Sequence, residues 1–196
     1  MSVPQGVFDR DDLIAGLRDL IIALDVTGER ASLRIVGGAA IALAYNAGRA
    51  STVDIDAALI PRDVVLAAAA GVAAEHAWVA DWINDKAEIF IPDGFGQRDA
   101  EWVLIAAVGN VEVYVASAET LLVMKLKAAM RRGLREVGDL RILLELTGIT
   151  SVDEADELLD AFYPTDSLTE KARDIVQIAL DTRPQGHVAP EVPALT

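Results

Sequence analysis

The sequence contains no cysteine and only two histidines among its 196 residues. Without cysteine, the chain cannot form disulfides, use a thiol nucleophile, or hold zinc or an iron–sulfur cluster through thiolates. The two histidines, His76 and His187, lie far apart in the sequence. Their separation argues against a histidine-based metal site and against a Ser-His-Asp triad.

A secretory signal and long apolar runs are also missing. Residues 1–12 show no basic segment followed by an apolar stretch, so we expect no signal peptide and a cytoplasmic protein. The longest apolar run, 64–74, is much shorter than the roughly 18–20 apolar residues that span a bilayer. It predicts a buried helix, and we expect no membrane partner.

Bases are scarce relative to acids: 17 Lys and Arg against 31 Asp and Glu give a formal net charge of −14. This balance argues against a protein that binds nucleic acid over its whole surface. The charge is uneven, because five bases and no acid occur over 125–135, whereas 151–170 holds seven acids and no base. We therefore expect a focused basic face on an acidic protein. With 53% apolar residues, the chain can bury a sizeable core.

Hydrophobic periodicity predicts both strands and helices. Strands are expected at 33–36, 53–59, 103–108 and 111–115, with a further candidate at 88–91. Helices are expected at 9–25, with Asp9 as its cap, and at 39–46, 62–75, 118–131, 136–147, 152–162 and 167–181. Gly109-Asn110 favours a tight hairpin between two of the strands. The pattern predicts an α/β core over 1–117, a helical region over 118–181 and a disordered tail over 182–196.

The most informative motifs are Gly37-Gly38 and Asp54-Ile55-Asp56. Residues i and i+2 of a strand point to the same face, so the two carboxylates are expected side by side. Two such anionic groups suit Mg²⁺, which prefers one or two carboxylates together with substrate phosphates. Glycines at a helix start let backbone N–H groups approach phosphate oxygens. Either motif alone is more often a solvated strand face or a simple turn, but together they favour phosphoryl or nucleotidyl transfer.

Two other nucleotide-binding folds are excluded by the same glycines. Position 42 is Ala, so the Gly-x-Gly-x-x-Gly spacing of dinucleotide-binding proteins is absent. The sequence also has no Gly-x-x-x-x-Gly-Lys-Ser/Thr motif, which rules out a P-loop NTPase.

Four further motifs make a resemblance specific. They are Arg49-Ala50-Ser51-Thr52-Val53-Asp54-Ile55-Asp56, Trp82-Ile83-Asn84-Asp85, Val113-Tyr114-Val115-Ala116-Ser117 leading into Met124-Lys125-Leu126, and Arg135-Glu136-Val137-Gly138-Asp139-Leu140. With Gly37-Gly38, they resemble the minimal nucleotidyltransferases of the AbiEii/MenT toxin type and their DUF6036 relatives, over about residues 30–165. The Gly-Gly and Asp-x-Asp core is shared by the whole polymerase-β-like superfamily. The resemblance implies an α+β fold in which a small mixed sheet with flanking helices precedes a C-terminal helical bundle.

The resemblance also implies roles for individual residues. Asp54 and Asp56 are the expected metal ligands, and Gly37-Gly38 is the expected phosphate-side turn. Thr52 matches a Ser or Thr that lies beside the nucleotide in the toxins.

The C-terminal motifs add two expected site residues. Lys125 falls where relatives place a lysine that reaches the triphosphate, and Asp139 where they place an acid that completes the site. Relatives usually have Arg-Asp where this chain has Arg135-Glu136, so Glu136 receives no role. Lys125 alternatively belongs to a solvated basic face.

The resemblance to this superfamily also implies a third carboxylate near the first two. Glu112 alternates with Val111, Val113 and Val115 and therefore leaves the opposite face of its strand. A solvent-facing position suits it equally well. Asp139 competes for the role and is preferred because of its motif.

We expect an Mg²⁺-dependent nucleotidyltransferase that moves a nucleoside monophosphate from a nucleoside triphosphate to an acceptor and releases pyrophosphate. Two metal ions are expected, with Mn²⁺ as a substitute. In the toxin relatives the acceptor is the 3′ end of tRNA, which the basic cluster over 125–135 could guide, and a cognate antitoxin is the implied partner. The alternatives are a non-catalytic interaction protein on the same fold, such as an antitoxin or regulatory pseudo-enzyme, and nucleotidyl transfer to a protein or small molecule.

Overall fold

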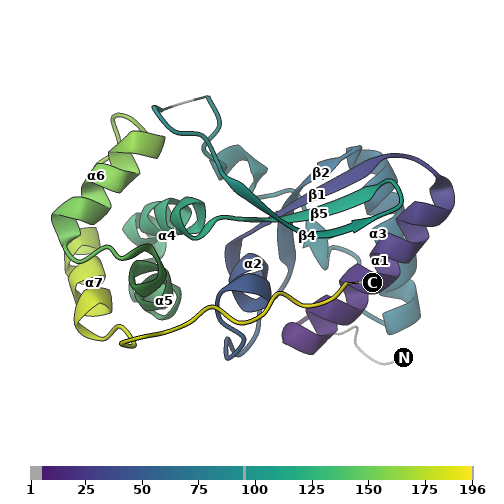
Figure 1. Cartoon of the computed structure of the whole chain (residues 1–196), viewed down its shortest axis with the longest axis horizontal. Helices are drawn as coiled ribbons and strands as arrows, with labels where there is room; N and C mark the ends of the chain where they lie inside the picture. Colours follow the sequence, from purple (N-terminus) through teal and green to yellow (C-terminus); the bar gives the residue numbers. More distant parts are fainter. Residues whose placement is uncertain (1–5, 95, 196) are drawn as a thin grey trace. The chain divides into compact units, whose positions relative to one another are not determined.

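The computed structural model describes residues 6–94 and 96–195 of the chain. Within these ranges the α-helices, labelled in Figure 1, are α1 (Arg10–Thr27), α2 (Gly37–Ala44), α3 (Arg62–His76), α4 (Ala118–Arg132), α5 (Val137–Thr147), α6 (Val152–Phe162) and α7 (Glu170–Asp181). The strands are β1 (Ala31–Val36), β2 (Ile55–Ile60), β3 (Ile83–Asn84), β4 (Trp102–Val108) and β5 (Val111–Ala116). Two short 3-10 helices are Glu88–Phe90 and Gly133–Glu136. A five-stranded mixed sheet with flanking helices, followed by a series of helices, confirms the expected α+β fold class.

The chain divides into two compact units. The first comprises Met1–Ile89, Trp102–Val115 and Pro190–Thr196, and the second comprises Phe90–Glu101 and Ala116–Ala189. The first unit therefore holds the sheet with α1 to α3, and the second holds α4 to α7. The domain boundaries expected from the sequence stay a prediction. In the described part of the chain, no helix is long and apolar enough to cross a membrane.

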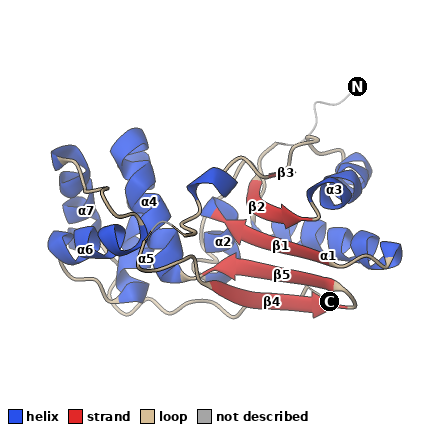
Figure 2. Ribbon diagram, turned by 90° about the horizontal axis from the view of Figure 1, so that it is seen from above, coloured by secondary structure: helices blue, strands red, loops and turns tan. Residues whose placement is uncertain are grey.

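The sheet has the strand order β3-β2-β1-β5-β4 (Figure 2). The central strand β1 runs antiparallel to β2 and parallel to β5, while β3 runs parallel to β2. β4 and β5 are neighbours joined by Gly109-Asn110, which confirms the predicted hairpin. The Gly109 φ of 52° lies in the left-handed region that such two-residue turns require.

The core of the first unit follows from alternation along its strands. Leu33 and Ile35 of β1 pair in register with Val113 and Val115 of β5, and all four side chains are fully buried. Each such burial contributes about 1.5–3 kcal/mol relative to an exposed side chain. α2 packs against β1 and β2, α3 packs against β2, and α1 packs against both helices. This packing fixes the place where β1 passes into α2.

Side-chain caps mark four helix starts. Asp9 accepts hydrogen bonds from the backbone N–H groups of Asp11 and Asp12 at the start of α1, as the sequence predicts. In the second unit, the starts of α4, α6 and α7 are capped in the same way by Ser117, Ser151 and Thr169. A cap of this kind contributes about 1 kcal/mol.

Helices α4 to α7 form the core of the second unit (Figure 1). α4 packs against α5, α6 and α7, and α5 packs against α7. The buried side chains include Leu122 and Leu126 of α4, Leu140 and Leu143 of α5, and Phe162 of α6. The helical C-terminal region predicted from periodicity is therefore confirmed.

Two strand predictions need correction. The expected strand over 88–91 is wrong, because Glu88–Phe90 forms a 3-10 helix whose first N–H donates to the Asp85 carbonyl. The strand expected over 53–59 begins only at Ile55, because Thr52 pairs instead with Phe8 in an isolated antiparallel bridge. The chain bends at Val53 between this bridge and β2, so Asp54 directly precedes the strand rather than lying in it.

The C-terminal segment, for which we expected disorder, has no helix or strand after α7 in its described part, up to residue 195. Its last residues lie within the first unit. There the Arg18 guanidinium donates to the Ala194 carbonyl, Arg10 donates to the Glu191 carbonyl, and the Leu195 side chain is buried.

Candidate functional site

The chain passes directly from β1 into α2, and the first two residues of the helix, Gly37 and Gly38, form a glycine turn. Gly37 has a φ of 67°, in the left-handed region that L side chains rarely adopt. The helix N-cap is Val36, and no side chain among the described residues caps the helix start. Since the first N–H groups of a helix have no partner within it, such a start suits an anionic ligand.

A carboxylate lies against this turn. Val36 pairs with Asp56 across β1 and β2, so the side chain of Asp56 lies at the end of β1. A Cβ atom placed on Gly37 would lie 3.4 Å from Asp56 Oδ2. The sequence motifs Gly-Gly and Asp-x-Asp therefore meet at Gly37 and Asp56.

The guanidinium group of Arg49 covers the second glycine. A Cβ atom placed on Gly38 would lie 2.8 Å from Arg49 Nη2, which is closer than packed carbon atoms approach. Arg49 Nη1 donates to the Ser51 carbonyl, which ties the side chain to the loop before β2. A cation thus lies beside an uncapped helix start, an arrangement that favours an anion.

Asp54 is held from the neighbouring strand. Its Oδ2 atom accepts a hydrogen bond of 2.9 Å from Nδ2 of Asn84, the last residue of β3. The hydroxyl of Thr52 donates to the Asp54 carbonyl at 3.1 Å, so Thr52 shapes the bend before β2. Asp54 and Asp56 are both half-buried.

Lys86 is electrostatically coupled to both aspartates. Its pKa is raised above the ordinary lysine value, first by its hydrogen bond to Asp81 and then by the charges of Asp81, Asp54 and Asp56, while desolvation acts in the opposite direction. Lys86 Nζ lies 2.9 Å from Asp81 Oδ2. One exposed cation therefore interacts electrostatically with both carboxylates of the Asp-x-Asp motif.

The donor set fits a magnesium ion that is completed by its substrate. Asp54 and Asp56 supply carboxylate oxygens, the ligands that Mg²⁺ prefers. The described residues contain no group of three or more Asp, Glu, His or Cys side chains that could hold an ion. Mg²⁺ commonly takes only one or two carboxylates from a protein and its remaining ligands from phosphates and water. These two aspartates are thus compatible with an ion that binds together with a phosphate-bearing ligand.

The second unit contains a buried ion-pair cluster around Lys125. Lys125 Nζ of α4 lies 2.7 Å from Glu136 Oε2 and 2.7 Å from Asp139 Oδ2. The three side chains are only 12%, 6% and 11% exposed. Arg132 adds a more distant cation, 4.0 Å from Glu136 Oε1. The two expected residues Lys125 and Asp139 are therefore brought together, along with Glu136, to which the sequence assigned no role.

Glu112 occupies a solvent-facing position, the second of the two positions considered for it. It is exposed, it accepts a hydrogen bond of 3.1 Å from the Tyr114 hydroxyl, and it pairs with Ser32 near the start of β1. The glycine turn follows Val36, four residues further along β1, which is about 13 Å at the rise of a strand. Glu112 is accordingly remote from the Gly37 turn and faces solvent.

The basic cluster does not form one helical stripe. α4 ends at Arg132, because Gly133 has a φ of 70° and the chain continues as a 3-10 helix that contains Arg135. Arg131 and Arg135 therefore do not lie one turn apart on a single α-helix. Lys127 forms an ion pair with Asp166 at 2.8 Å, so one base of the cluster pairs with the acidic 151–170 segment.

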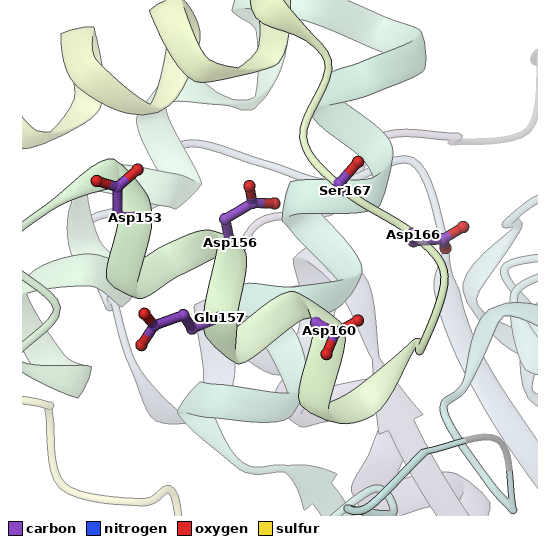
Figure 3. Close-up of a pocket in the computed structure, with 6 residues that line it drawn as sticks. All are labelled: Asp153, Asp156, Glu157, Asp160, Asp166 and Ser167. Atoms are coloured by element: carbon purple, nitrogen blue, oxygen red, sulfur yellow. The ribbon is translucent and has the colours of Figure 1, made fainter.

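A pocket of about 430 Å³ in the second unit is lined by acids (Figure 3). Its lining residues are Asp153, Asp156, Glu157 and Asp160 of α6, and Asp166 and Ser167 of the following loop. Arg173 forms ion pairs with Asp153 and Asp156. Because the pocket is strongly negative, it does not suit a nucleotide phosphate, and none of the expected site residues lines it.

Three residues around the glycine turn, Asp54 and Asp56 received no role from the sequence: Arg49, Asn84 and Lys86. Arg49 and Asn84 stand inside motifs that carried the resemblance, and this was the available signal. Their roles could not be derived because each meets its partner across a loop or a strand pair. Lys86 follows Asn84 by two residues and shows no signal of its own.

The fold is a mixed sheet in which a strand passes through a double-glycine turn into a helix, with a carboxylate of the neighbouring strand against that turn. This arrangement is consistent with a nucleotidyltransferase-like fold. The family described as "Nucleotidyltransferase of unknown function (DUF6036)" matches residues 13–159, and the chain belongs to this family. The match includes every expected site residue. No curated protein and no solved structure matches the chain.

Proposed function

We propose that this protein is an Mg²⁺-dependent nucleotidyltransferase, which transfers a nucleoside monophosphate from a nucleoside triphosphate to an acceptor and releases pyrophosphate. One observation carries the proposal: Asp56 Oδ2 would lie 3.4 Å from a Cβ atom on Gly37, so a carboxylate and an uncapped helix start occupy one place. An uncapped helix start can bind a phosphate, and a carboxylate can bind a divalent cation. Membership of a nucleotidyltransferase family supports the same function.

Asp54 and Asp56 are the residues proposed to hold the metal, as two Mg²⁺ ions or, in substitution, Mn²⁺. When bound there, the metal supplies charge neutralisation for the triphosphate and for its leaving pyrophosphate. The chain's own contribution is to present two carboxylates from the end of one loop and the start of β2. Asp56 is positioned by the pairing of β2 with β1, and Asp54 is positioned by the hydrogen bond that it accepts from Asn84.

The glycine turn and Arg49 are proposed to bind and orient the triphosphate. Backbone N–H groups at Gly37 and Gly38 can donate to phosphate oxygens, because no Cβ atom covers them. The Arg49 guanidinium over Gly38 adds a cation whose planar donors suit phosphate. Thr52 is proposed to lie beside the nucleotide, as the resemblance implies.

In the proposed reaction, a hydroxyl of the acceptor attacks the α-phosphorus. A new P–O bond forms to the acceptor, the P–O bond to pyrophosphate breaks, and the hydroxyl proton is released to a base. Lys125 and Asp139 keep their proposed roles, Lys125 toward the triphosphate and Asp139 in completing the site. The structure shows their ion pair with each other, within the second unit.

The acceptor and the partner are proposed from the resemblance to the AbiEii/MenT toxins. The 3′ end of tRNA is the first candidate acceptor, and a cognate antitoxin is the corresponding protein partner. The exposed side chains of Arg131, Arg132 and Arg135 are available to meet a polyanion over a short stretch. Transfer to a protein or a small molecule, and a non-catalytic interaction role, are the alternatives that the following experiment separates.

The experiment is a labelling reaction with each of the four α-³²P nucleoside triphosphates, Mg²⁺ and a cell extract. Digestion with ribonuclease or protease, and chromatography of the small molecules, then identify the labelled acceptor. We expect one triphosphate to label RNA, and we expect Asp56→Ala to abolish the label. Label in protein or in small molecules would show that the acceptor is not RNA. No transfer from any of the four triphosphates would refute the catalytic proposal and leave an interaction role.

A further inference from the structure

Asn84 is a buried polar residue beside the proposed metal ligands. It is 5% exposed, and among the described residues of the first unit it is the only buried polar or charged side chain. An amide is tolerated in such a place only when its donors and acceptor have partners. The hydrogen-bond partners of the buried Asn84 amide therefore indicate its role at the candidate site.

All the hydrogen-bonding groups of the Asn84 amide are used. Nδ2 donates to Asp54 Oδ2 at 2.9 Å and, more weakly, to the Asp81 carbonyl at 3.4 Å. Oδ1 accepts the backbone N–H of Lys86 at 3.0 Å. Because a backbone N–H can only donate, the oxygen of the amide must face Lys86, and the NH₂ group must then face Asp54.

β3, the edge strand that carries Asn84, is held by β2 and, through Trp82, by α3. β3 pairs in parallel with β2, with Asn84 opposite Asp56, and the Ile55 N–H donates to the Trp82 carbonyl at 2.7 Å. The Trp82 side chain is fully buried, and its indole N–H donates to the Ala69 carbonyl of α3 at 3.0 Å. The amide is consequently fixed in position before any ligand binds.

A neutral donor has a particular advantage in this place. A hydrogen bond to one oxygen of the Asp54 carboxylate restricts rotation of that group and so directs both of its oxygens. A lysine or arginine there would do the same but would also neutralise the charge that attracts a cation. The amide orients the carboxylate and leaves its negative charge intact.

We infer that Asn84 is a positioning residue that holds the Asp54 carboxylate in the orientation for binding a divalent cation. The inference rests on the proposed function, because Asp54 is a metal ligand only within it. Partners that orient a metal ligand typically change metal affinity by about 10- to 100-fold when they are removed. Asn84 is therefore expected to act on metal affinity by way of Asp54.

The test measures Mn²⁺ binding to the full chain by the loss of the electron paramagnetic resonance signal of free Mn²⁺. Asp54→Ala defines which part of the binding belongs to the proposed site. We expect Asn84→Ala to raise the Mn²⁺ dissociation constant at this site by about 10- to 100-fold. The matched control is Asn110→Ala, which removes an amide that donates to the Gly28 carbonyl at 3.0 Å in the same unit. This control should leave Mn²⁺ binding unchanged.

Two further measurements separate positioning from a general loss of structure. Circular dichroism checks that each variant is folded, and Asn84→Ser, whose hydroxyl is too short to reach Asp54, replaces Asn84→Ala if that variant does not fold. In the Asp54→Ala background, Asn84→Ala should cause no further loss of Mn²⁺ affinity, because its effect passes through the missing carboxylate.

The outcomes are distinct. If the unmodified chain shows no Mn²⁺ binding that Asp54→Ala removes, the proposed function and this inference both fail. If the unmodified chain binds Mn²⁺ and a folded Asn84 variant binds it equally well, only the positioning role is refuted. An equal loss with and without Asp54 would also refute it, because Asn84 would then act on the fold in general.

Discussion

The two glycines of the β1–α2 turn are adjacent, yet the structure predicts opposite effects for the same substitution. In Gly37→Ala, the new methyl group meets Asp56 Oδ2 at 3.4 Å, which is ordinary contact, but the residue must keep a φ of 67°. An L residue in the left-handed region costs about 1–2 kcal/mol. We therefore expect Gly37→Ala to lower the free energy of unfolding by this amount.

Gly38→Ala differs because Gly38 lies in α2 with ordinary helical backbone. Its methyl group would lie 2.8 Å from Arg49 Nη2, and the flexible end of that side chain can move away. Alanine is favoured over glycine in a helix by roughly 0.5–1 kcal/mol, so the stability should be unchanged or slightly raised. The displaced guanidinium should instead weaken triphosphate binding, which raises KM.

Urea unfolding and steady-state kinetics on the same preparations measure both effects. Gly71→Ala in α3 is the control, because a Cβ atom there meets nothing within 4 Å. It should raise stability by roughly 0.5–1 kcal/mol without affecting KM. If Gly37→Ala is as stable as the unmodified chain, the positive φ of Gly37 carries no strain for alanine. If Gly38→Ala destabilises the chain as much as Gly37→Ala, the two positions do not differ in the predicted way.

Three further predictions follow from particular contacts. Lys125→Met should destabilise the protein by about 3–5 kcal/mol, because it removes the cation that lies 2.7 Å from each of two buried carboxylates; urea unfolding that shows under about 1 kcal/mol would contradict this. Asp56→Ala should change the unfolding free energy by less than about 1 kcal/mol while abolishing transfer, and transfer within tenfold of the unmodified chain would refute the metal role. Burial raises the pKa of Tyr45 from 10.0 to about 12, so the stability that the neutral phenol contributes is present below pH 10 and lost as the pH rises toward about 12. Unfolding curves from pH 9 to 12 should show this loss in the unmodified chain and a smaller one in Tyr45→Phe.

Local features of this protein could be derived from the sequence because they depend on neighbours along the chain. Apolar residues at helical spacing and the Asp9 cap predicted α1, and Gly109-Asn110 between two β-rich runs predicted the β4–β5 hairpin. The order of Gly37-Gly38 and Asp54-Ile55-Asp56 predicted a turn and a pair of carboxylates for the same reason. Each of these signals involves a few consecutive residues whose backbone preferences are short-range.

Only the tertiary structure decided which distant residues meet. β3 has two residues, too few for alternation to show, and it forms only because β2 offers a parallel edge for Ile83 and Asn84. The hydrogen bond from Asn84 to Asp54 and the approach of Arg49 to Gly38 depend on that sheet and on the loop before β2. Glu136 likewise reaches Lys125 only because α4 stops at Gly133 and the chain returns through a 3-10 helix. Pairing of this kind is set by packing across the fold, and the spacing of residues along one chain does not encode it.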